Sequence, residues 1–215
     1  MSNTLVNALK VTTLFRNLSF DEALAAMNSI MDGEATDAQI AGFLISLKMK
    51  GETAEEIAAF AQAMRKHAKP VRGGENALDI VGTGGDFSNT FNVSTVSSMV
   101  ISAAGFPVAK HGSHGSSSLC GSADVLKELG VKLDPDPELS AQMLEKIGIC
   151  FMYAPWHHTS MRYVTPARKQ LGVPTLFNIL GPMANPAGVG FQMIGAYNAD
   201  LAAKIAQVLV ILGVK

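Results

Sequence analysis

The N-terminal part of the chain carries apolar residues at helical spacing, and each apolar run follows a helix-capping signal. In such a signal a Ser or Thr hydroxyl accepts from a backbone N–H, and a Glu or Gln three residues later reaches back. The signals are Ser19 with Glu22, Thr36 with Gln39 and Thr53 with Glu56. A weaker apolar pattern covers residues 4–15. These patterns predict a small helical domain of four helices over residues 1–70.

Beyond Pro70, short apolar runs alternate with segments of helical spacing. We expect strands near residues 77–81, 107–110, 149–153 and 190–196. We expect helices near residues 93–104, 123–129, 137–147, 161–171 and 199–212. Such alternation favours a parallel sheet covered by helices. The predicted fold class is therefore α/β, with a small N-terminal helical domain and a larger α/β domain over residues 75–215 that has a mainly parallel central sheet.

The composition adds few constraints. A formal net charge of −1 without Lys/Arg runs argues against a nucleic-acid partner, which needs clustered cations. No apolar run reaches the roughly 18 residues that span a bilayer, and no signal peptide is evident, so we expect no membrane partner and a cytoplasmic location. Cys120 and Cys150 lack metal-type spacing, and we expect both to be buried as small apolar residues.

A glycine-rich turn follows the first predicted strand. Gly82-Thr83-Gly84-Gly85-Asp86 precedes Asn92-Val93-Ser94-Thr95, where a helix is predicted to begin. Glycines permit positive φ and close backbone approach, and a helix N-terminus presents N–H groups, so a phosphate or diphosphate would fit here. The turn alone is equally compatible with a tight strand-to-helix connection. It is neither a Walker loop nor a dinucleotide fingerprint.

Two further polar segments, residues 110–118 and 154–158, also follow predicted strands. Ligands of parallel sheets bind where the carboxyl ends of the strands meet. There Lys110 would hold an anion, hydroxyls would hold phosphate or ribose oxygens, and Asp86 would hold a donor or the water shell of a cation. The combination suits a sugar phosphate.

In this order, these residues closely resemble the anthranilate phosphoribosyltransferase family, a glycosyltransferase family of tryptophan biosynthesis. The matching segments cover essentially the whole chain. They are residues 49–53, 82–86, 92–95, 110–112, 117–118, 121–126, 158–162, 168, 171–172 and 177–186. The resemblance implies a helical domain to which a segment near residues 166–186 returns, and a homodimer associating through that domain.

The resemblance also implies an activity and its site. A phosphoribosyl group would pass from phosphoribosyl diphosphate (PRPP) to anthranilate, with Mg²⁺ neutralising the diphosphate and Ser94 as a metal ligand. The implied PRPP contacts are Gly82, Thr83, Gly84, Gly85, Asp86, Thr90, Asn92, Ser94, Thr95, Lys110 and Ser122. The implied anthranilate contacts are Gly82, His111, Ser113, His158 and Arg168, of which Arg168 would match the carboxylate. No general base is assigned, since an arylamine attacks as a neutral nucleophile.

The chain departs from the family's pattern at two places. Ser113 and His114 stand where the family usually carries Asn-Arg, which leaves the acceptor open. The chain ends at Lys215, where the alternation calls for another strand and the family continues with an acidic pair for a second magnesium. We therefore expect a fragment or a shortened form that is weak or inactive by itself, with an uncovered sheet edge.

Two alternatives stay open at this point. A pyrimidine nucleoside phosphorylase of the same fold superfamily would cleave thymidine or uridine with phosphate instead of consuming PRPP. A catalytically silent homologue would bind a phosphorylated ligand or nucleic acid without catalysis, which the altered Ser113-His114 segment and the early end would favour. The absence of a basic patch makes nucleic acid the weaker version.

Overall fold

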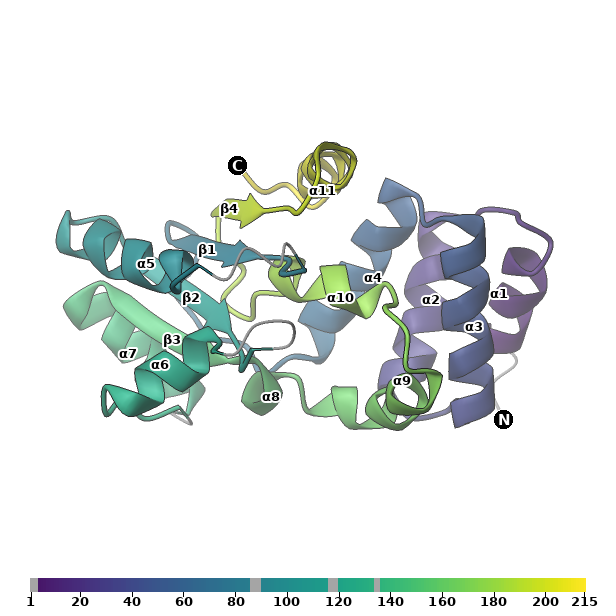
Figure 1. The fold of residues 1–215 in the computed structure, drawn as a ribbon, viewed down its shortest axis with the longest axis horizontal. Helices are drawn as coiled ribbons and strands as arrows, with labels where there is room; N and C mark the ends of the chain where they lie inside the picture. Colours follow the sequence, from purple (N-terminus) through teal and green to yellow (C-terminus); the bar gives the residue numbers. More distant parts are fainter. Residues whose placement is uncertain (1–3, 86–89, 116–119, 134–135) are drawn as a thin grey trace. The chain divides into compact units, whose positions relative to one another are not determined.

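The computed structural model describes residues 4–85, 90–115, 120–133 and 136–215, and the chain divides into two units (Figure 1). The helical unit comprises Met1–Ala68, His158–Ala184 and Lys204–Leu212. The sheet unit comprises Lys69–His157, Asn185–Ala203 and Gly213–Lys215. No helix within the described ranges has both the length and the apolar character that crossing a membrane requires.

Four helices form the core of the helical unit: α1 (Thr4–Thr12), α2 (Phe20–Met31), α3 (Asp37–Lys50) and α4 (Ala54–His67). All three predicted capping boxes are present, each with both of its hydrogen bonds. α2 packs on α4, while α1 packs on α2 and α3. The apolar stripes meet in a core where the Phe43 and Phe60 rings pack edge to face, with centroids 6.1 Å apart. Local capping and apolar spacing therefore account for this bundle.

A later segment of the chain packs on the same bundle. It contains η1 (Thr159–Tyr163), α9 (Thr165–Leu171), α10 (Phe177–Leu180) and η2 (Gly181–Met183), of which η1 contacts α2, α9 contacts α3 and α10 contacts α4. The single helix predicted over residues 161–171 is wrong, because the helix is interrupted at Val164. Pro166 lacks an N–H group and is accommodated in the first turn of α9, where no such donor is needed.

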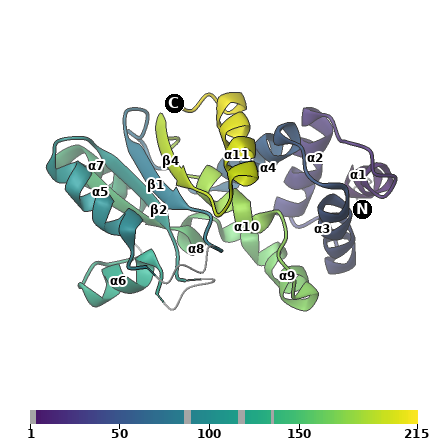
Figure 2. The ribbon, with the colours of Figure 1, turned by 45° about the horizontal axis from the view of Figure 1, so that its top comes forward.

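The sheet unit has four parallel strands in the order β3-β2-β1-β4. They are β1 (Leu78–Gly82), β2 (Val108–Gly112), β3 (Ile149–Tyr153) and β4 (Phe191–Gly195). Figure 2 shows β4, β1 and β2 side by side. The helices that follow these strands are α5 (Val93–Ala103), α6 (Ser122–Glu128), α7 (Pro137–Ile147), α8 (Ala154–His157) and α11 (Ala199–Ile211). Since all neighbouring pairs are parallel, the carboxyl ends of the strands share one edge of the sheet.

The two cysteines differ in environment. Cys150 lies on β3 within the apolar core of the sheet unit, as predicted. The prediction for Cys120 is wrong, because this residue is exposed. It lies in the turn before α6 and not inside a strand or a helix, so no apolar layer covers it.

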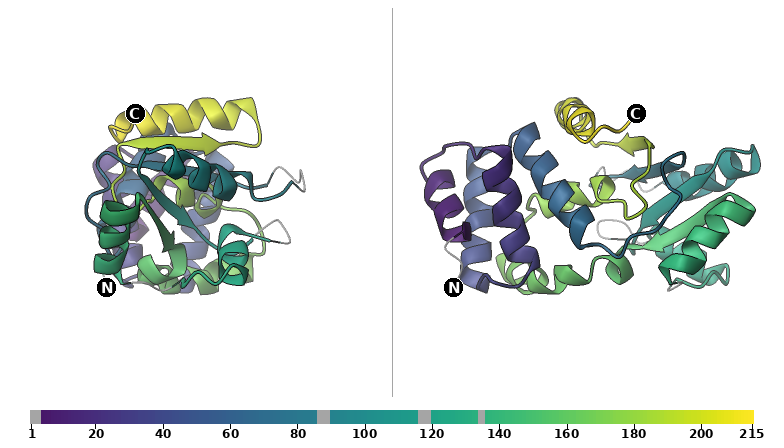
Figure 3. Two further views of the ribbon diagram at one scale, coloured as in Figure 1. Left: turned by 90° about the vertical axis from the view of Figure 1, so that its left-hand side faces the viewer. Right: turned by 180° about the vertical axis from the view of Figure 1, so that it is seen from behind.

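The outer side of β4 pairs with the end of the chain. The Lys215 N–H donates to the Gly190 carbonyl over 2.9 Å, and the Lys215 carbonyl accepts from the Gln192 N–H over 3.1 Å. Figure 3 marks this end of the chain with C. Apolar side chains are exposed nearby in the sequence, with Met193 on β4 65% exposed and Val210 on α11 76% exposed.

The inner pair, β1 and β2, opens along its length. Leu78 and Val108 face each other in register at the start of the two strands. If the parallel ladder continued from there, the His111 N–H would donate to the Ile80 carbonyl two residues further on. Leu78 and Val108 are the only registered pair of these strands among the described residues, and each of the two groups further on has a side chain as a partner.

The His111 N–H donates to Asp79 Oδ1 over 3.1 Å. The Ile80 carbonyl accepts from Lys110 Nζ over 2.6 Å. Buried backbone groups must find partners, and here the partners are a carboxylate and an ammonium from the same two strands. Asp79 and Lys110 thus occupy positions that backbone groups hold in an unbroken ladder.

A third side chain, from a segment distant in the sequence, bonds both strands. Asn185 Nδ2 donates to Asp79 Oδ2 over 2.8 Å and to the Ala109 carbonyl over 2.9 Å. The Asn185 side-chain oxygen accepts from the Ala187 N–H over 2.8 Å, which fixes the orientation of the amide. We call Asp79, Lys110 and Asn185, which separate the two strands, the strand fork.

In the helical unit, one of the capping residues is itself buried. Glu56 is fully buried and accepts from the backbone N–H groups of Leu18 and Thr53 and from Lys50 Nζ, each over 2.8 Å. We predict that Glu56→Ala lowers the free energy of unfolding by about 3–5 kcal/mol, because it leaves the buried Lys50 ammonium without its counter-ion and two N–H groups without an acceptor. The exposed capping box at Glu22 provides the control, and Glu22→Ala should cost about 1 kcal/mol. Urea unfolding measures both values, and equal losses would contradict the prediction.

Candidate functional site

The glycine-rich turn follows β1 and is hydrogen-bonded to the carboxyl end of β4. Gly84 and Gly85 have φ angles of +68° and +80°, which L side chains rarely adopt, so glycine is needed at both positions. The Thr83 N–H donates to the Gly195 carbonyl over 2.9 Å, which fixes the turn beside the end of β4. Asp86, the last residue of the predicted motif, lies outside the described residues.

The N-terminus of α5 follows this turn and has no acidic residue in its first turn. Its N-cap, Asn92, makes no capping bond and donates instead to the Cys120 carbonyl over 3.1 Å. Thr95 is 2% exposed, and its hydroxyl has no hydrogen-bond partner among the described residues. Ser94 is half-buried beside it, and Thr90 is exposed. A helix N-terminus with hydroxyls and no carboxylate of its own suits an anion.

The segment after β2 is held against the start of α6, which contains Ser122. The Ser113 carbonyl accepts from the Ala123 N–H over 3.1 Å. Gly121 approaches so closely that a Cβ there would lie 2.2 Å from the Gly115 nitrogen. The Asn92 bond to Cys120 ties this region to the start of α5. The segments after β1 and β2 are therefore connected at the carboxyl edge of the sheet.

The His114 departure has a local explanation. Asp124 accepts from the Gly121 N–H over 2.7 Å and from the Gly115 N–H over 3.2 Å, and it also bonds His114 Nδ1. The bonds from Gly121 and His114 bring the pKa of Asp124 down to about 2. The His114 ring also packs edge to face on Tyr153, with centroids 5.3 Å apart. Through these contacts with Asp124 and Tyr153, His114 fixes the segment that follows β2.

Lys110 brings a buried cation to the strands that lead to this edge. It is 3% exposed, and its ammonium contacts the Ile80 carbonyl, two residues before Gly82. Burial lowers the pKa of Lys110, and the negative charge of Asp79 opposes that shift. Burial likewise raises the pKa of Asp79 to about 6, against the effects of Lys110 and of the hydrogen bonds from Asn185 and His111.

Sequence reasoning missed two members of the strand fork. Asp79 did carry a signal, since it is a single acidic residue inside the apolar run Ala77-Leu78-Asp79-Ile80-Val81, next to a strand that contains Lys110. Asn185 carried no comparable signal, because its contacts with Asp79 and Ala109 join residues that lie far apart in the sequence.

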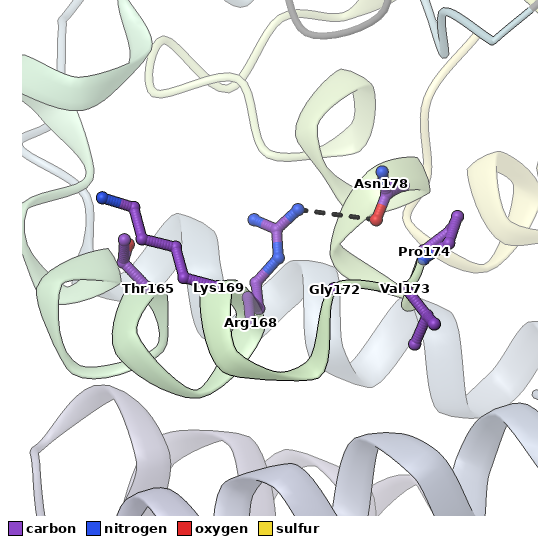
Figure 4. A pocket seen from close by; sticks show the side chains of 7 residues that line it. All are labelled: Thr165, Arg168, Lys169, Gly172, Val173, Pro174 and Asn178. Carbon is purple, nitrogen blue, oxygen red and sulfur yellow. Dashed lines mark hydrogen bonds between the residues drawn. The ribbon is translucent and has the colours of Figure 1, made fainter.

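Two of the residues predicted to contact anthranilate belong to the helical unit. His158 is 5% exposed and precedes η1, and Arg168 lies on α9. A cavity of about 300 Å³ beside Arg168 is lined by Thr165, Arg168, Lys169, Gly172, Val173, Pro174 and Asn178 (Figure 4). The other predicted contacts, His111, Ser113 and Gly82, belong to the sheet unit.

The Arg168 side chain is positioned by its neighbours on α10. Its Nη2 donates to Asn178 Oδ1 over 3.4 Å, and its guanidinium carbon lies 5.5 Å from the centre of the Phe177 ring. Burial lowers the pKa of Arg168, although not enough to deprotonate a guanidinium. A planar cation beside an aromatic ring, in a cavity whose lining has no acidic residue, suits a planar carboxylate.

The donor atoms at the start of α5 fit a magnesium ion held mainly by its ligand. No group of three His, Cys, Asp or Glu residues in the described part of the chain could hold a metal. The hydroxyls of Ser94 and Thr95 are oxygen donors, which Mg²⁺ prefers. Mg²⁺ commonly takes few protein ligands and completes its shell with substrate phosphates and water.

Comparison with known proteins identifies the family. Residues 74–215 match the model of the "Glycosyl transferase family, a/b domain", and residues 6–68 match that of the "Glycosyl transferase family, helical bundle domain". An anthranilate phosphoribosyltransferase of Ruminiclostridium cellulolyticum is 54% identical over 200 residues, which cover 93% of this chain and 59% of that protein.

Two solved structures agree with that result. Anthranilate phosphoribosyltransferase from Thermus thermophilus superposes with a TM-score of 0.92 at 43% identity, covering 96% of this chain and 63% of that one. The Saccharomyces cerevisiae enzyme in complex with PRPP and Mg gives a TM-score of 0.90 at 30% identity, covering 99% and 64%. The chain spans about three fifths of the length of the curated relatives it matches, at 59% of the Ruminiclostridium protein. The chain belongs to the glycosyl transferase family that includes the anthranilate phosphoribosyltransferases.

Proposed function

We propose that this chain acts in the transfer of a phosphoribosyl group from PRPP to anthranilate, which gives N-(5-phosphoribosyl)anthranilate and diphosphate. The observation that carries the proposal is the buried Lys110 ammonium on the carbonyl of Ile80, in the strand that leads into the positive-φ glycine turn. The names of the similar proteins support the same activity, and they favour neither a nucleoside phosphorylase nor a silent homologue.

On the donor side, the sheet unit would bind PRPP at the carboxyl edge of its strands. Backbone N–H groups of the glycine turn and of the start of α5 would hold the phosphate oxygens, and Lys110 would supply the positive charge. The proposed contacts are Gly82, Thr83, Gly84, Gly85, Asp86, Thr90, Asn92, Ser94, Thr95, Lys110 and Ser122. Mg²⁺, held by Ser94 and the diphosphate, would neutralise charge on the leaving group.

In the proposed reaction, these residues would stabilise the diphosphate leaving group. Diphosphate leaves the ribose C1 as the amine arrives, so negative charge grows on the leaving group and positive charge on the ring. Fixed N–H groups and a buried ammonium stabilise the leaving group without reorganising. Because the amine is neutral, positioning of the two reactants supplies much of the remaining rate.

On the acceptor side, Arg168 would bind the anthranilate carboxylate. Its guanidinium presents paired donors that match a carboxylate, and the cavity beside it is large enough for a small ring. Gly82, His111, Ser113 and His158 are the further proposed contacts.

We also propose that the protein is a cytoplasmic homodimer, which associates through helices of the helical unit. Leu14 and Phe15, which follow α1, and Met49 on α3 are 63–68% exposed. A second copy would remove these apolar side chains from water.

Lys110→Met tests the donor site. The substitution keeps the length of the side chain and removes its charge, so the dissociation constant for PRPP with Mg²⁺ should rise about 100-fold, as for a lost charge-assisted contact. Isothermal titration calorimetry on the 215-residue chain measures the change. Lys204→Met is the matched control, because Lys204 Nζ donates to the Glu52 carbonyl. An unchanged affinity in Lys110→Met would refute the proposed site.

Arg168→Lys tests the acceptor site. Lysine keeps the charge and loses the paired donors, so the dissociation constant for anthranilate should rise about 10-fold while that for PRPP stays the same. Anthranilate fluorescence in the presence of PRPP and Mg²⁺ reports this binding. Arg162→Lys, at an exposed arginine that bonds Tyr163, is the control. A parallel loss of PRPP affinity in Arg168→Lys would contradict the assignment.

A further inference from the structure

The strand fork fixes the position of the Lys110 ammonium. Lys110 Nζ donates to the Ile80 carbonyl over 2.6 Å, a carbonyl that would otherwise accept from β2. Asp79 accepts the His111 N–H that this exchange releases. Asn185 holds the other carboxylate oxygen. The lysine head group is thus placed by the backbone of β1, and the carboxylate is placed by β2 and by Asn185.

The charges at the fork are balanced locally. Asp79 is the carboxylate that acts on Lys110 from β1. The groups that face Asp79 are Lys110 and the His111 N–H on β2, Cys150 on β3, and the amides of Asn185 and of Gln192 on β4. Burial and the charge of Asp79 raise the pKa of the Cys150 thiol to about 12, so it carries no charge at neutral pH. Lys110 is therefore the cation that balances Asp79.

The pair is not joined as an ordinary ion pair. Asp79 and Lys110 form none of the salt bridges found among the described residues, and the carboxylate oxygens accept from His111 and Asn185 instead. The carboxylate therefore stabilises the ammonium through space without using its N–H groups. One of those N–H groups reaches Ile80, and an ammonium has three.

We propose that Asp79, held by Asn185, is a positioning residue that keeps Lys110 as an ammonium with N–H groups left for the diphosphate of the donor substrate. The identity of this ligand, the diphosphate of PRPP, rests on the proposed function. The state of Lys110 itself does not, and it is measured separately below.

An isolated buried ammonium loses its proton easily, because burial disfavours the charged form. In Asp79→Asn the titration midpoint of Lys110 should therefore fall, as followed by the ¹³Cε and ¹⁵Nζ signals of labelled lysine. The Lys110 signal is assigned by its absence in Lys110→Met. Glu56→Gln is the matched control, because Glu56 is another fully buried carboxylate that accepts backbone N–H groups and bonds a lysine, within the helical unit. In Glu56→Gln the titration midpoint of Lys110 should equal that in the wild type.

The second readout is the pH profile of PRPP binding. From pH 6.5 to 8.5, the ratio of the PRPP dissociation constant of Asp79→Asn to that of the wild type, both with Mg²⁺, should rise at least about 10-fold, because Lys110 loses its proton at a lower pH in the variant. The ratio to the wild type at each pH removes the titration of PRPP itself. A constant ratio together with an unchanged Lys110 midpoint would overturn the inference.

The two proposals fail in different ways. If the wild type binds no PRPP at any pH while the Lys110 midpoint falls in Asp79→Asn, the proposed function fails and the role of Asp79 stands. If Asp79→Asn does not fold, the reciprocal experiment decides: the carboxyl ¹³C midpoint of Asp79 should rise in Lys110→Met, because the interaction acts equally on both groups. No rise would overturn the role of Asp79.

Discussion

The opening between β1 and β2 is the constraint on which the sheet unit depends. Beyond Leu78, backbone groups of the two strands have side chains as partners, and three of these contacts come from Asp79, Lys110 and Asn185. Buried N–H and carbonyl groups are costly without partners, so these side chains are needed for the fold. The same exchange leaves a buried cation on the carbonyl of Ile80, in the strand that leads into the glycine turn. One set of hydrogen bonds therefore serves folding and, in the function we propose, anion binding.

The other described segments of the proposed PRPP site contribute fixed hydrogen-bond donors and no further buried charge. The glycine turn is held to β4 through Thr83, and the loop after β2 is held to α6 through Asp124. The start of α5 has no acidic residue in its first turn. Electrostatic stabilisation in such a place acts through fixed N–H groups and a single buried ammonium. This arrangement suits a substrate that brings its own negative charge and metal ion.

A fully buried carboxylate accepts a backbone N–H group in each unit, but the two carboxylates interact differently with a lysine. In the helical unit, Glu56 is fully buried, accepts two backbone N–H groups and bonds Lys50. In the sheet unit, Asp79 is fully buried and also accepts a backbone N–H, but it balances Lys110 without a salt bridge among the described residues. In the first arrangement the lysine has three acceptors, which are Glu56, the Asn17 side chain and the Gly51 carbonyl. The second leaves the lysine with hydrogen-bonding capacity, which is why we assign a binding role to Lys110 and none to Lys50.

The amino-acid sequence determined the features that depend on neighbours along the chain. Capping boxes, apolar spacing and the alternation of strands with helices are local, so the bundle and the parallel strands could be predicted from them. The glycines at positive φ could be predicted for the same reason. Tertiary structure alone decided the strand fork, because Asn185 and Asp79 meet across 106 residues of sequence. It also decided the burial of Glu56 and the exposure of Cys120, since local pattern does not reveal which surfaces a folded chain covers.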